Sequence, residues 1–290
     1  MNLEKLKEII TKVRPGYNNL NIKKLRWQGK DNTSFLMDGR FLIKIPKSYN
    51  HSIKFEKENK ILPFIYPYFS YKIPNLVDQF TFDTENGEVR NAGIYNWIEG
   101  QSLNLIKNPN KEVIALGLSN FLNELHKIPV KGKDYLRPGI HNFYRGGPLL
   151  VYDYDTRKYL KNLKGIIDEK KATILWEKAL ESSPKENVFL HGDLEPGNLI
   201  IGEDRKLKAI IDWGGVGIGE PACDLVMAYK FFEGKNRHTF LNNLSILDEE
   251  ILHRTKGWIL WKSLFLLDKM RNKNSLLAQK EKILINSLFS

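Results

Sequence analysis

Hydrophobic positions in the first thirteen residues recur at helical spacing. They stop at the Pro15–Gly16 pair, which does not continue a helix. The positions are Leu3, Leu6, Ile9, Ile10 and Val13. We therefore expect a short amphipathic helix that covers the sheet formed by the next segments.

Short apolar runs separated by turn residues follow. Three of them span residues 22–27, 34–37 and 41–45, with a turn at 29–32 and another at Asp38–Gly39. Such runs predict an antiparallel meander. A second hairpin is expected from 79–82 and 93–97 around an Asn86–Gly87 turn, and a helix is expected over roughly 53–65.

Beyond Gly100 the pattern becomes helical. One apolar stripe ends just before Pro129 and consists of Ile114, Leu118, Phe121, Leu122 and Leu125. Two helices are expected at 248–272 and 275–289, where Trp258, Trp261 and Phe265 would enter an apolar core or line an acceptor site. The pattern predicts an α+β fold, with an antiparallel N-terminal sheet and a mainly helical remainder.

Composition narrows the class of protein. With 290 residues, the chain can form one large or two closely packed domains, and its single cysteine, Cys223, excludes an intramolecular disulfide and fits a reducing compartment. The N-terminus has no uninterrupted hydrophobic segment, and no apolar run reaches membrane-spanning length. We expect a soluble cytoplasmic protein with no membrane partner. The sequence does not indicate an oligomeric state.

The net charge of +11 comes from 45 basic and 34 acidic residues. A basic protein concentrates anions, and both nucleic acids and nucleotides are anions. The lysines are scattered along the chain, and no nucleic-acid-binding module is visible. We therefore expect no nucleic-acid partner and favour a nucleotide.

The segment 188–213, VFLHGDLEPGNLIIGEDRKLKAIIDW, carries the candidate chemistry. Asp193 follows an apolar strand, Asn198 comes five residues later, and Asp212 follows a second strand that a charged turn folds back. Transfer of a γ-phosphoryl group needs a positioned acceptor hydroxyl and neutralised phosphate charge. A carboxylate suits the base, and carboxylate and amide oxygens suit Mg²⁺. We assign Asp193 as base and Asn198 with Asp212 as metal ligands. Capping and turn roles would explain each residue alone, but not their joint spacing.

The sequence HGDLEPGN followed by IDW resembles the catalytic loop and metal segment of the aminoglycoside phosphotransferase family, a distant relative of protein kinases. His-Gly-Asp replaces the His-Arg-Asp of protein kinases, and Trp-Gly follows Asp212, so a protein kinase is disfavoured. The resemblance extends over most of the chain. It implies a two-lobed protein-kinase-like fold with lobes at 1–97 and 98–290 and a linker at about 95–100. Nucleotide and Mg²⁺ would bind between the lobes.

The resemblance also assigns a role to Lys44, whose side chain points to the opposite strand face from its neighbours. It would contact the α- and β-phosphates and pair with a helix glutamate. We favour Glu58 over the nearby Glu56. A solvated strand face and solvated helix acids are the structural alternatives.

Two further segments are implied to bind the nucleotide. The turn QGKDNTSF, residues 28–35, would cover the phosphates, although a plain hairpin turn is an equal alternative. Its candidate residues are Gly29, Asn32 and Ser34. The segment IYNWIEG resembles the linker, where main-chain groups would bind the base, so ATP and GTP both remain open. The candidates there are Asn96, Trp97 and Ile98.

Acidic residues define the acceptor site less clearly. Asp153 and Asp155 lie in a segment, 140–160, that resembles a region of some bacterial family members and is a candidate wall of the acceptor pocket, although a structural loop with a capping aspartate is favoured. Glu195 and the run 248–250 are further candidates for binding a cation. Residues 221–290 contain 11 Lys plus Arg against 7 Asp plus Glu, which argues against a broadly acidic substrate lobe.

Two other residues receive expected roles. Asp224 matches an acidic residue that braces the catalytic loop in related kinases, and His126 is expected to pack at a helix end instead of binding a ligand.

The resemblance therefore implies Mg²⁺-dependent transfer of the γ-phosphate of ATP or GTP to a small hydroxyl compound. An aminoglycoside or another antibiotic, such as a macrolide, is a candidate acceptor. The alternatives are a kinase for a choline-like alcohol, a sugar or homoserine, and a non-catalytic nucleotide-binding protein with a kinase fold.

Overall fold

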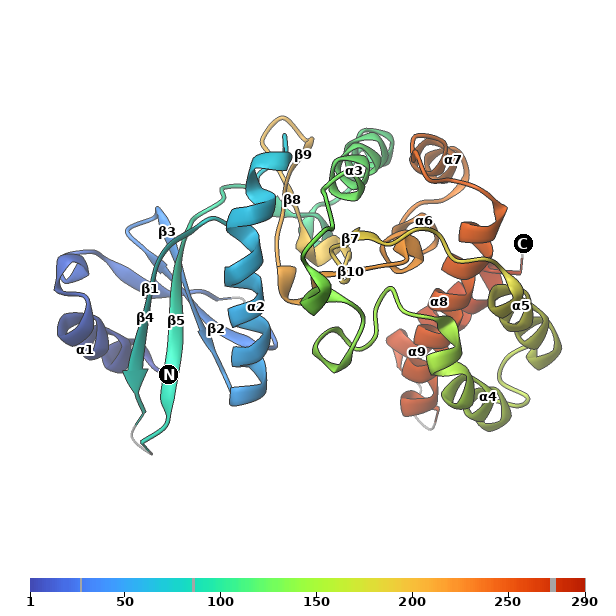
Figure 1. Ribbon diagram of the computed structural model, residues 1–290, viewed down its shortest axis with the longest axis horizontal. Helices are drawn as coiled ribbons and strands as arrows, with labels where there is room; N and C mark the ends of the chain where they lie inside the picture. Colours follow the sequence, from blue (N-terminus) through green and yellow to red (C-terminus); the bar gives the residue numbers. More distant parts are fainter. Residues whose placement is uncertain (27, 85–86, 272–274, 290) are drawn as a thin grey trace.

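The computed structural model describes residues 1–26, 28–84, 87–271 and 275–289 (Figure 1). Three expected positions lie outside these ranges: Trp27 in the first apolar run, Asn86 in the second hairpin turn, and Asn272 at a helix end.

The N-terminal part is a five-stranded antiparallel sheet in the order β1-β2-β3-β5-β4. The strands are β1 Ile22–Lys24, β2 Asn32–Met37, β3 Phe41–Pro46, β4 Leu76–Asp83 and β5 Val89–Asn96. The predicted meander and second hairpin are confirmed. The first strand is shorter than expected because the Gln28 side chain donates to the carbonyls of both Leu25 and Ser34.

Two helices cover the faces of this sheet. Helix α1, Leu3–Val13, matches the predicted amphipathic helix and buries Leu6, Ile9 and Ile10 against the sheet. Helix α2, Tyr49–Ile65, lies on the opposite face, between the sheet and the rest of the molecule (Figure 1). It begins four residues before the expected start because the Ser48 carbonyl accepts the N–H groups of His51 and Ser52.

The remainder is mainly helical and contains the two long C-terminal helices that were predicted. The helices are α3 Lys111–His126, α4 Asp153–Asn162, α5 Glu169–Glu181, α6 Met227–Lys230, α7 Gly234–Asn242, α8 Glu249–Met270 and α9 Leu276–Ser287. Its largest hydrophobic core contains residues from the C-terminal half of α2, from α3 and from the short strands of the second lobe. The two-lobed, kinase-like α+β fold is thus confirmed.

Two small antiparallel sheets lie in the second lobe. One pairs β7, Val188–Leu190, with β10, Gly217–Gly219. The other has the order β6-β8-β9, formed by Gln101–Ser102, Leu199–Ile201 and Leu207–Ile210. Within the described residues, no helix has the length and apolarity needed to cross a membrane.

Candidate active site

The β8–β9 hairpin brings together the three polar residues singled out in the motif. The Asn198 carbonyl accepts the Ile211 N–H at 2.9 Å, which sets Asn198 beside the residue that precedes Asp212. The Asn198 amide nitrogen donates to the Asp193 carbonyl at 2.8 Å. Because the amide nitrogen is held in this way, the side-chain oxygen of Asn198 is left to accept a ligand.

A buried carboxylate holds the loop that carries Asp193. Asp224 accepts the N–H of His191 at 2.7 Å and the N–H of Gly192 at 2.8 Å, so the predicted bracing role is confirmed. Burial raises the pKa of Asp224 to about 7, against the effect of these two bonds. Gly192 has φ 77°, and a Cβ there would collide with the Gly215 carbonyl oxygen. This contact explains a glycine where protein kinases have arginine.

His191 is a structural member of the loop. Its Nδ1 accepts the Asp193 N–H, and its Nε2 lies 3.1 Å from the Ile211 carbonyl, so a neutral ring that donates from Nε2 satisfies both atoms. Burial lowers its pKa, although the charges of Asp193 and Asp212 oppose this effect. The ring packs against Trp213 with 4.8 Å between centroids. His191 therefore ties the loop to the segment that contains Asp212.

Lys44 and Glu58 form a buried ion pair with 3.0 Å between Nζ and Oε1. Their side chains are only 12% and 2% exposed. Glu56, the other candidate partner, accepts from Asn91 at the surface instead. Burial lowers the pKa of Lys44, but the charges of Glu58 and Asp212 outweigh this effect and raise it. The charge of Asp212 therefore acts on Lys44, which shows that the two side chains lie near each other.

The turn expected to cover the phosphates is already bonded to its own lobe. Gln28 binds both the N–H and the carbonyl of Ser34, and Lys47 donates to the Gly29 carbonyl at 2.6 Å. The Asn32 side-chain oxygen is buried and has no partner in the described chain. Asp31 contacts Lys54 at 2.8 Å and His51 at 3.3 Å on α2. Within the described residues, the Asn32 side-chain oxygen is thus a group of this turn that could accept from a ligand.

Among the three candidate residues of the linker, one N–H group is left for a base. The Asn96 N–H donates to the Asn75 carbonyl and the Trp97 N–H donates to the Arg40 carbonyl, at 3.1 and 2.8 Å. The N–H of Ile98 has no acceptor within the described part of the chain. Of the three candidate residues, Ile98 is the one whose donor is free.

The structure separates the acidic candidates into two groups. Asp153 accepts from Arg157 and from Trp176 Nε1, and Asp248 caps α8 while it pairs with Lys185, so these two acids support the fold. Asp155 and Glu195 line the same pocket as Asp193, and Glu195 lies 3.5 Å from Lys230. Only this second group lies in a position to contact an acceptor.

The pocket beside Asp193 has a volume of about 610 Å³, and most of its lining residues are apolar or aromatic. The Tyr152 and Trp261 ring centroids are 3.9 Å apart, and Trp258 stacks on Trp261 at 4.7 Å. Trp261 Nε1 is buried and has no partner within the described residues. The expectation that the C-terminal helices line the acceptor site agrees with this geometry. The buried Cys223 contributes to the pocket wall, and burial raises the pKa of its thiol well above the usual value.

Three basic residues line this pocket: Arg145, Lys230 and Lys262. Arg145 lies in the segment 140–160 that was a candidate wall of the acceptor pocket, whereas the two lysines were not expected there. Arg145 Nη2 lies 3.2 Å from Asp193 Oδ1, and burial together with the charges of Arg145 and Lys230 lowers the pKa of Lys262. The Gly-Gly-Pro turn marks the segment of Arg145, but nothing in the sequence signals that α6 and α8 deliver lysines to the same place.

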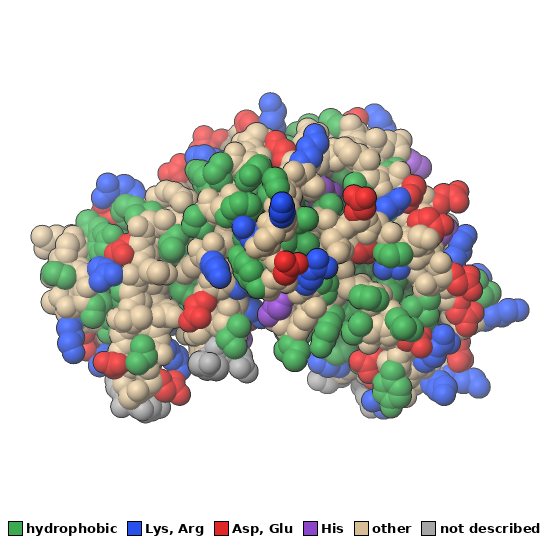
Figure 2. Space-filling view, viewed as in Figure 1, with side chains coloured by type: hydrophobic (Ala, Val, Ile, Leu, Met, Phe, Trp, Pro, Cys, Tyr) green, Lys and Arg blue, Asp and Glu red, His purple; other side chains and the backbone are tan. Residues whose placement is uncertain are grey.

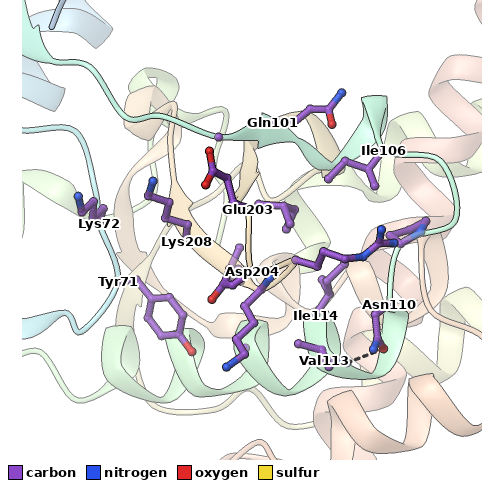
Figure 3. Close-up of a pocket in the computed structure, with 18 of the residues that line it drawn as sticks. Tyr71, Lys72, Gln101, Ile106, Asn110, Val113, Ile114, Glu203, Asp204 and Lys208 are labelled. Atoms are coloured by element: carbon purple, nitrogen blue, oxygen red, sulfur yellow. Dashed lines mark hydrogen bonds between the residues drawn. The ribbon is translucent and has the colours of Figure 1, made fainter.

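A larger cavity, of about 1210 Å³, lies elsewhere (Figure 3). It is bounded by the end of the linker, α3 and the β8–β9 turn, with Gln101, Asn110 and Glu203 on its walls. It contains none of Lys44, Asp193, Asn198 or Asp212. Of these four residues, Asp193 lines the smaller pocket.

Comparisons with known proteins agree with this geometry. Residues 22–258 match a protein-family model described as the phosphotransferase enzyme family. A comparison with curated protein sequences gives no significant match.

Several solved structures share the fold. The GDP and kanamycin complex of APH(2")-IIia has a TM-score of 0.75 and 19% identity over 99% of this chain and 98% of that chain. The GDP complex of wild-type aminoglycoside 2'-phosphotransferase-IIIa has a TM-score of 0.71 and 18% identity, over 99% and 97%. The macrolide 2'-phosphotransferase MphH from Brachybacterium faecium has a TM-score of 0.64 and 16% identity, over 98% and 97%.

Proposed function

Because the chain belongs to the phosphotransferase enzyme family, we propose that it transfers the γ-phosphate of ATP or GTP to a hydroxyl of a bulky, largely apolar small molecule. The observation that carries this proposal is the position of Asp193. It lines the aromatic pocket, and its carbonyl accepts from Asn198, whose own carbonyl binds the N–H of Ile211 directly before Asp212. A base in this position can accept the proton of the acceptor hydroxyl while the phosphate approaches from the other side.

The nucleotide would bind in the cleft between the lobes. Lys44, held by Glu58, would bind phosphate oxygens, and the free N–H of Ile98 would bind the edge of the base. The solved structures described above with GDP support a nucleotide in this fold. ATP and GTP are both retained, since a main-chain donor can serve either base.

The donor set fits Mg²⁺. Asn198 offers a side-chain oxygen whose amide nitrogen is already bonded, and Asp212 adds a carboxylate. Mg²⁺ commonly takes one or two protein oxygens and completes its shell with water and phosphate, so a larger acidic cluster is not required. Among the described residues no group of three or more His, Cys, Asp or Glu is arranged for a metal. When bound, the ion would neutralise phosphate charge.

The acceptor class follows from the lining of the pocket. Its acidic residues Asp155, Asp193 and Glu195 are balanced by Arg145, Lys230 and Lys262, so the pocket has no excess negative charge. Apolar and aromatic side chains surround these groups, and several of them are exposed, including Ile140, Phe143 and Val151. Hydrophobic side chains gather on this face over the segment before α4 (Figure 2). A macrolide, bulky and rich in hydroxyls, fits this lining.

An aminoglycoside is the second candidate. Asp155 and Glu195 are available to its ammonium groups, and a kanamycin complex has this fold. A polycation would need more convergent carboxylates than these two, since Lys230 already neutralises Glu195. Small metabolites such as homoserine would leave much of the 610 Å³ unfilled. A non-catalytic protein is disfavoured because Lys44, Asp193, Asn198 and Asp212 are all present.

The test is a labelled-transfer assay with ATP and GTP, with and without Mg²⁺. The acceptor panel contains macrolides, aminoglycosides, choline, sugars and homoserine. We expect transfer to a macrolide, weaker or no transfer to aminoglycosides, and loss of turnover without the metal. Wild-type protein that binds nucleotide but phosphorylates no acceptor would favour the non-catalytic alternative.

Substitutions assign the roles. Asp193→Ala should lower turnover by about 10²- to 10⁴-fold, the usual contribution of a general base, and leave Mg-nucleotide binding nearly unchanged. Asp212→Ala should weaken the metal-dependent part of nucleotide binding. Asp204→Ala, in the exposed β8–β9 turn, is the matched control and should change neither quantity. Normal turnover of Asp193→Ala would remove the assigned base.

A further inference from the structure

The turn that precedes Arg145 has an unusual backbone. Phe143 and Tyr144 both have left-handed conformations, with φ 55° and 58°, although neither is a glycine. Each such residue costs about 1 kcal/mol or more, and strain of this kind gathers at functional sites. The side chain that this turn positions is therefore a candidate for a functional role.

Hydrogen bonds on all sides force the turn into this shape. The buried Asn142 side chain accepts the Gly139 N–H at 3.0 Å and donates to the Arg145 carbonyl at 3.2 Å. Tyr152 donates its hydroxyl to the Phe143 carbonyl at 2.6 Å. A segment this well bonded delivers its next side chain to a fixed place.

That side chain is Arg145, which points at Asp193. The two groups are 3.2 Å apart, and the arginine side chain is 17% exposed. Its Cδ would lie 3.4 Å from a Cβ placed on Gly192, so the guanidinium passes directly over the loop. It stands at the edge of the acceptor pocket that faces the cleft.

Several cations gather around Arg145, although Lys54 is paired with Asp31 and Arg145 itself with Asp193. Lys54 Nζ lies 5.1 Å from the centre of the Phe143 ring and Arg145 Cζ lies 5.5 Å from it, so two cations share one aromatic side chain. Burial, followed by the charges of Arg145 and Lys54, lowers the pKa of Lys57 to about 7. An incoming anion would relieve this repulsion.

We propose that Arg145 is a further catalytic residue, whose guanidinium binds the transferring phosphoryl group. The inference rests on the proposed function. In the step, the bond from the γ-phosphorus to the leaving nucleotide oxygen breaks, a bond to the acceptor oxygen forms, and the hydroxyl proton passes to Asp193. Arg145 donates N–H groups to the equatorial phosphoryl oxygens, as an arginine supplied by the same chain. Before the nucleotide binds, Arg145 is paired with Asp193.

The experiment compares Arg145→Met and Arg145→Lys with Arg137→Met. Arg137 lies in the same segment, is well exposed and pairs only with Asp134 at the surface. We expect Arg145→Met to lower kcat by about 10²- to 10³-fold, the usual effect of losing a donor to developing charge. KM for nucleotide and acceptor should change little. Arg145→Lys should recover part of the rate because it keeps the charge but loses the planar fork. Arg137→Met should behave as wild type.

Two further readouts exclude a merely structural effect. Millimolar guanidinium should restore part of the turnover of Arg145→Ala, and methylammonium should restore less. Arg145→Met should bind nucleoside diphosphate with Mg²⁺ normally but lose the additional affinity that aluminium fluoride, a planar phosphoryl mimic, gives to the wild type. Unchanged kcat and retained aluminium fluoride affinity in Arg145→Met would overturn this inference but leave the proposed function intact. Absence of nucleotide binding and turnover in the wild-type protein would overturn the proposed function, and this inference with it.

Discussion

Asp224 shows how much one buried side chain contributes to the candidate site. Its two oxygens accept the N–H groups of His191 and Gly192, directly before Asp193. No water is needed to satisfy these donors, and the position of the base depends on a side chain 31 residues further along the chain.

We predict that Asp224→Asn destabilises the protein by about 1–3 kcal/mol, because the amide group leaves one buried N–H without an acceptor. Turnover should fall with it, since the backbone of the loop is released. Urea unfolding and the transfer assay measure the two effects. Asp204→Asn, in an exposed turn, provides the control. Wild-type stability in Asp224→Asn would show that the two hydrogen bonds contribute nothing.

The sequence predicts the role of a single residue where that role depends on its spacing from neighbouring residues. The interval between Asp193 and Asn198, and the strand before Asp212, place all three from one continuous segment. The pairing of Lys44 with Glu58 could be predicted because Lys44 lies on a strand and Glu58 on the helix that follows it. Lys230 and Lys262 reach the acceptor pocket only through the packing of α6 and α8, which no local pattern encodes.

Among the elements, α8 is tied to the segment after β10 by a buried pair of charges. Arg254 Nε lies 3.4 Å from Glu220 Oε1, and the side chains are 5% and 6% exposed. Burial raises the pKa of Glu220, although Arg254 opposes this effect. Arg254 also donates to the Ser182 carbonyl after α5. The pair thus joins three parts of the second lobe.

We predict that Arg254→Met or Glu220→Leu alone destabilises the protein by about 3–5 kcal/mol, because the remaining charge stays buried without its partner. The double substitution should cost less than the two single costs combined, with a coupling of about 1–3 kcal/mol. Denaturant unfolding of the four proteins measures this cycle. Simple additivity would show that the two charges do not interact.

Helices and strands were predicted correctly where the apolar spacing is regular. Their ends were missed where hydrogen bonds to the backbone determine them. Helix α1 and the stripe of α3 follow directly from their hydrophobic periods. The start of α2 does not, because its first turn contains no apolar repeat and is set by hydrogen bonds to Ser48. The end of β1 was missed because a side chain, Gln28, replaces strand pairing.

For the molecule as a whole, Lys57 connects the two lobes. It lies on α2, donates to the Val216 carbonyl at 2.8 Å and lies 3.3 Å from His141 Nδ1. The charged groups that act on it are Arg145, Lys54 and Glu58. Burial and the two cations lower the pKa of Lys57 to about 7, against an ordinary value of 10.5.

This shift predicts a pH dependence of stability. Between about pH 7 and 10.5 the unfolded chain binds a proton at Lys57 that the folded protein lacks, so this contribution to stability rises with pH across that window. Below pH 7 both states are protonated, and the contribution stays at its lowest value. Lys57→Met should therefore flatten the rise of the thermal midpoint between pH 7 and 9.5.

The matched control is Lys60→Met, an exposed lysine of the same helix, which should keep the wild-type pH profile. Identical profiles for Lys57→Met and wild type would show that Lys57 is protonated equally in both states.

The pairing of β6 with β8 keeps the linker between the two lobes short. Trp97 is bonded to Arg40 of the first lobe, whereas Gln101 already pairs with Ile201 of the second. Only residues 98–100 lie between these anchors, which is consistent with the boundary after residue 97 that we propose. Gly100 has φ 146°, and a Cβ there would lie 2.6 Å from the Ile201 carbonyl oxygen. We predict that any relative motion of the lobes has its hinge in this backbone. The base would then move little, and the phosphates, farther from the hinge, would move more.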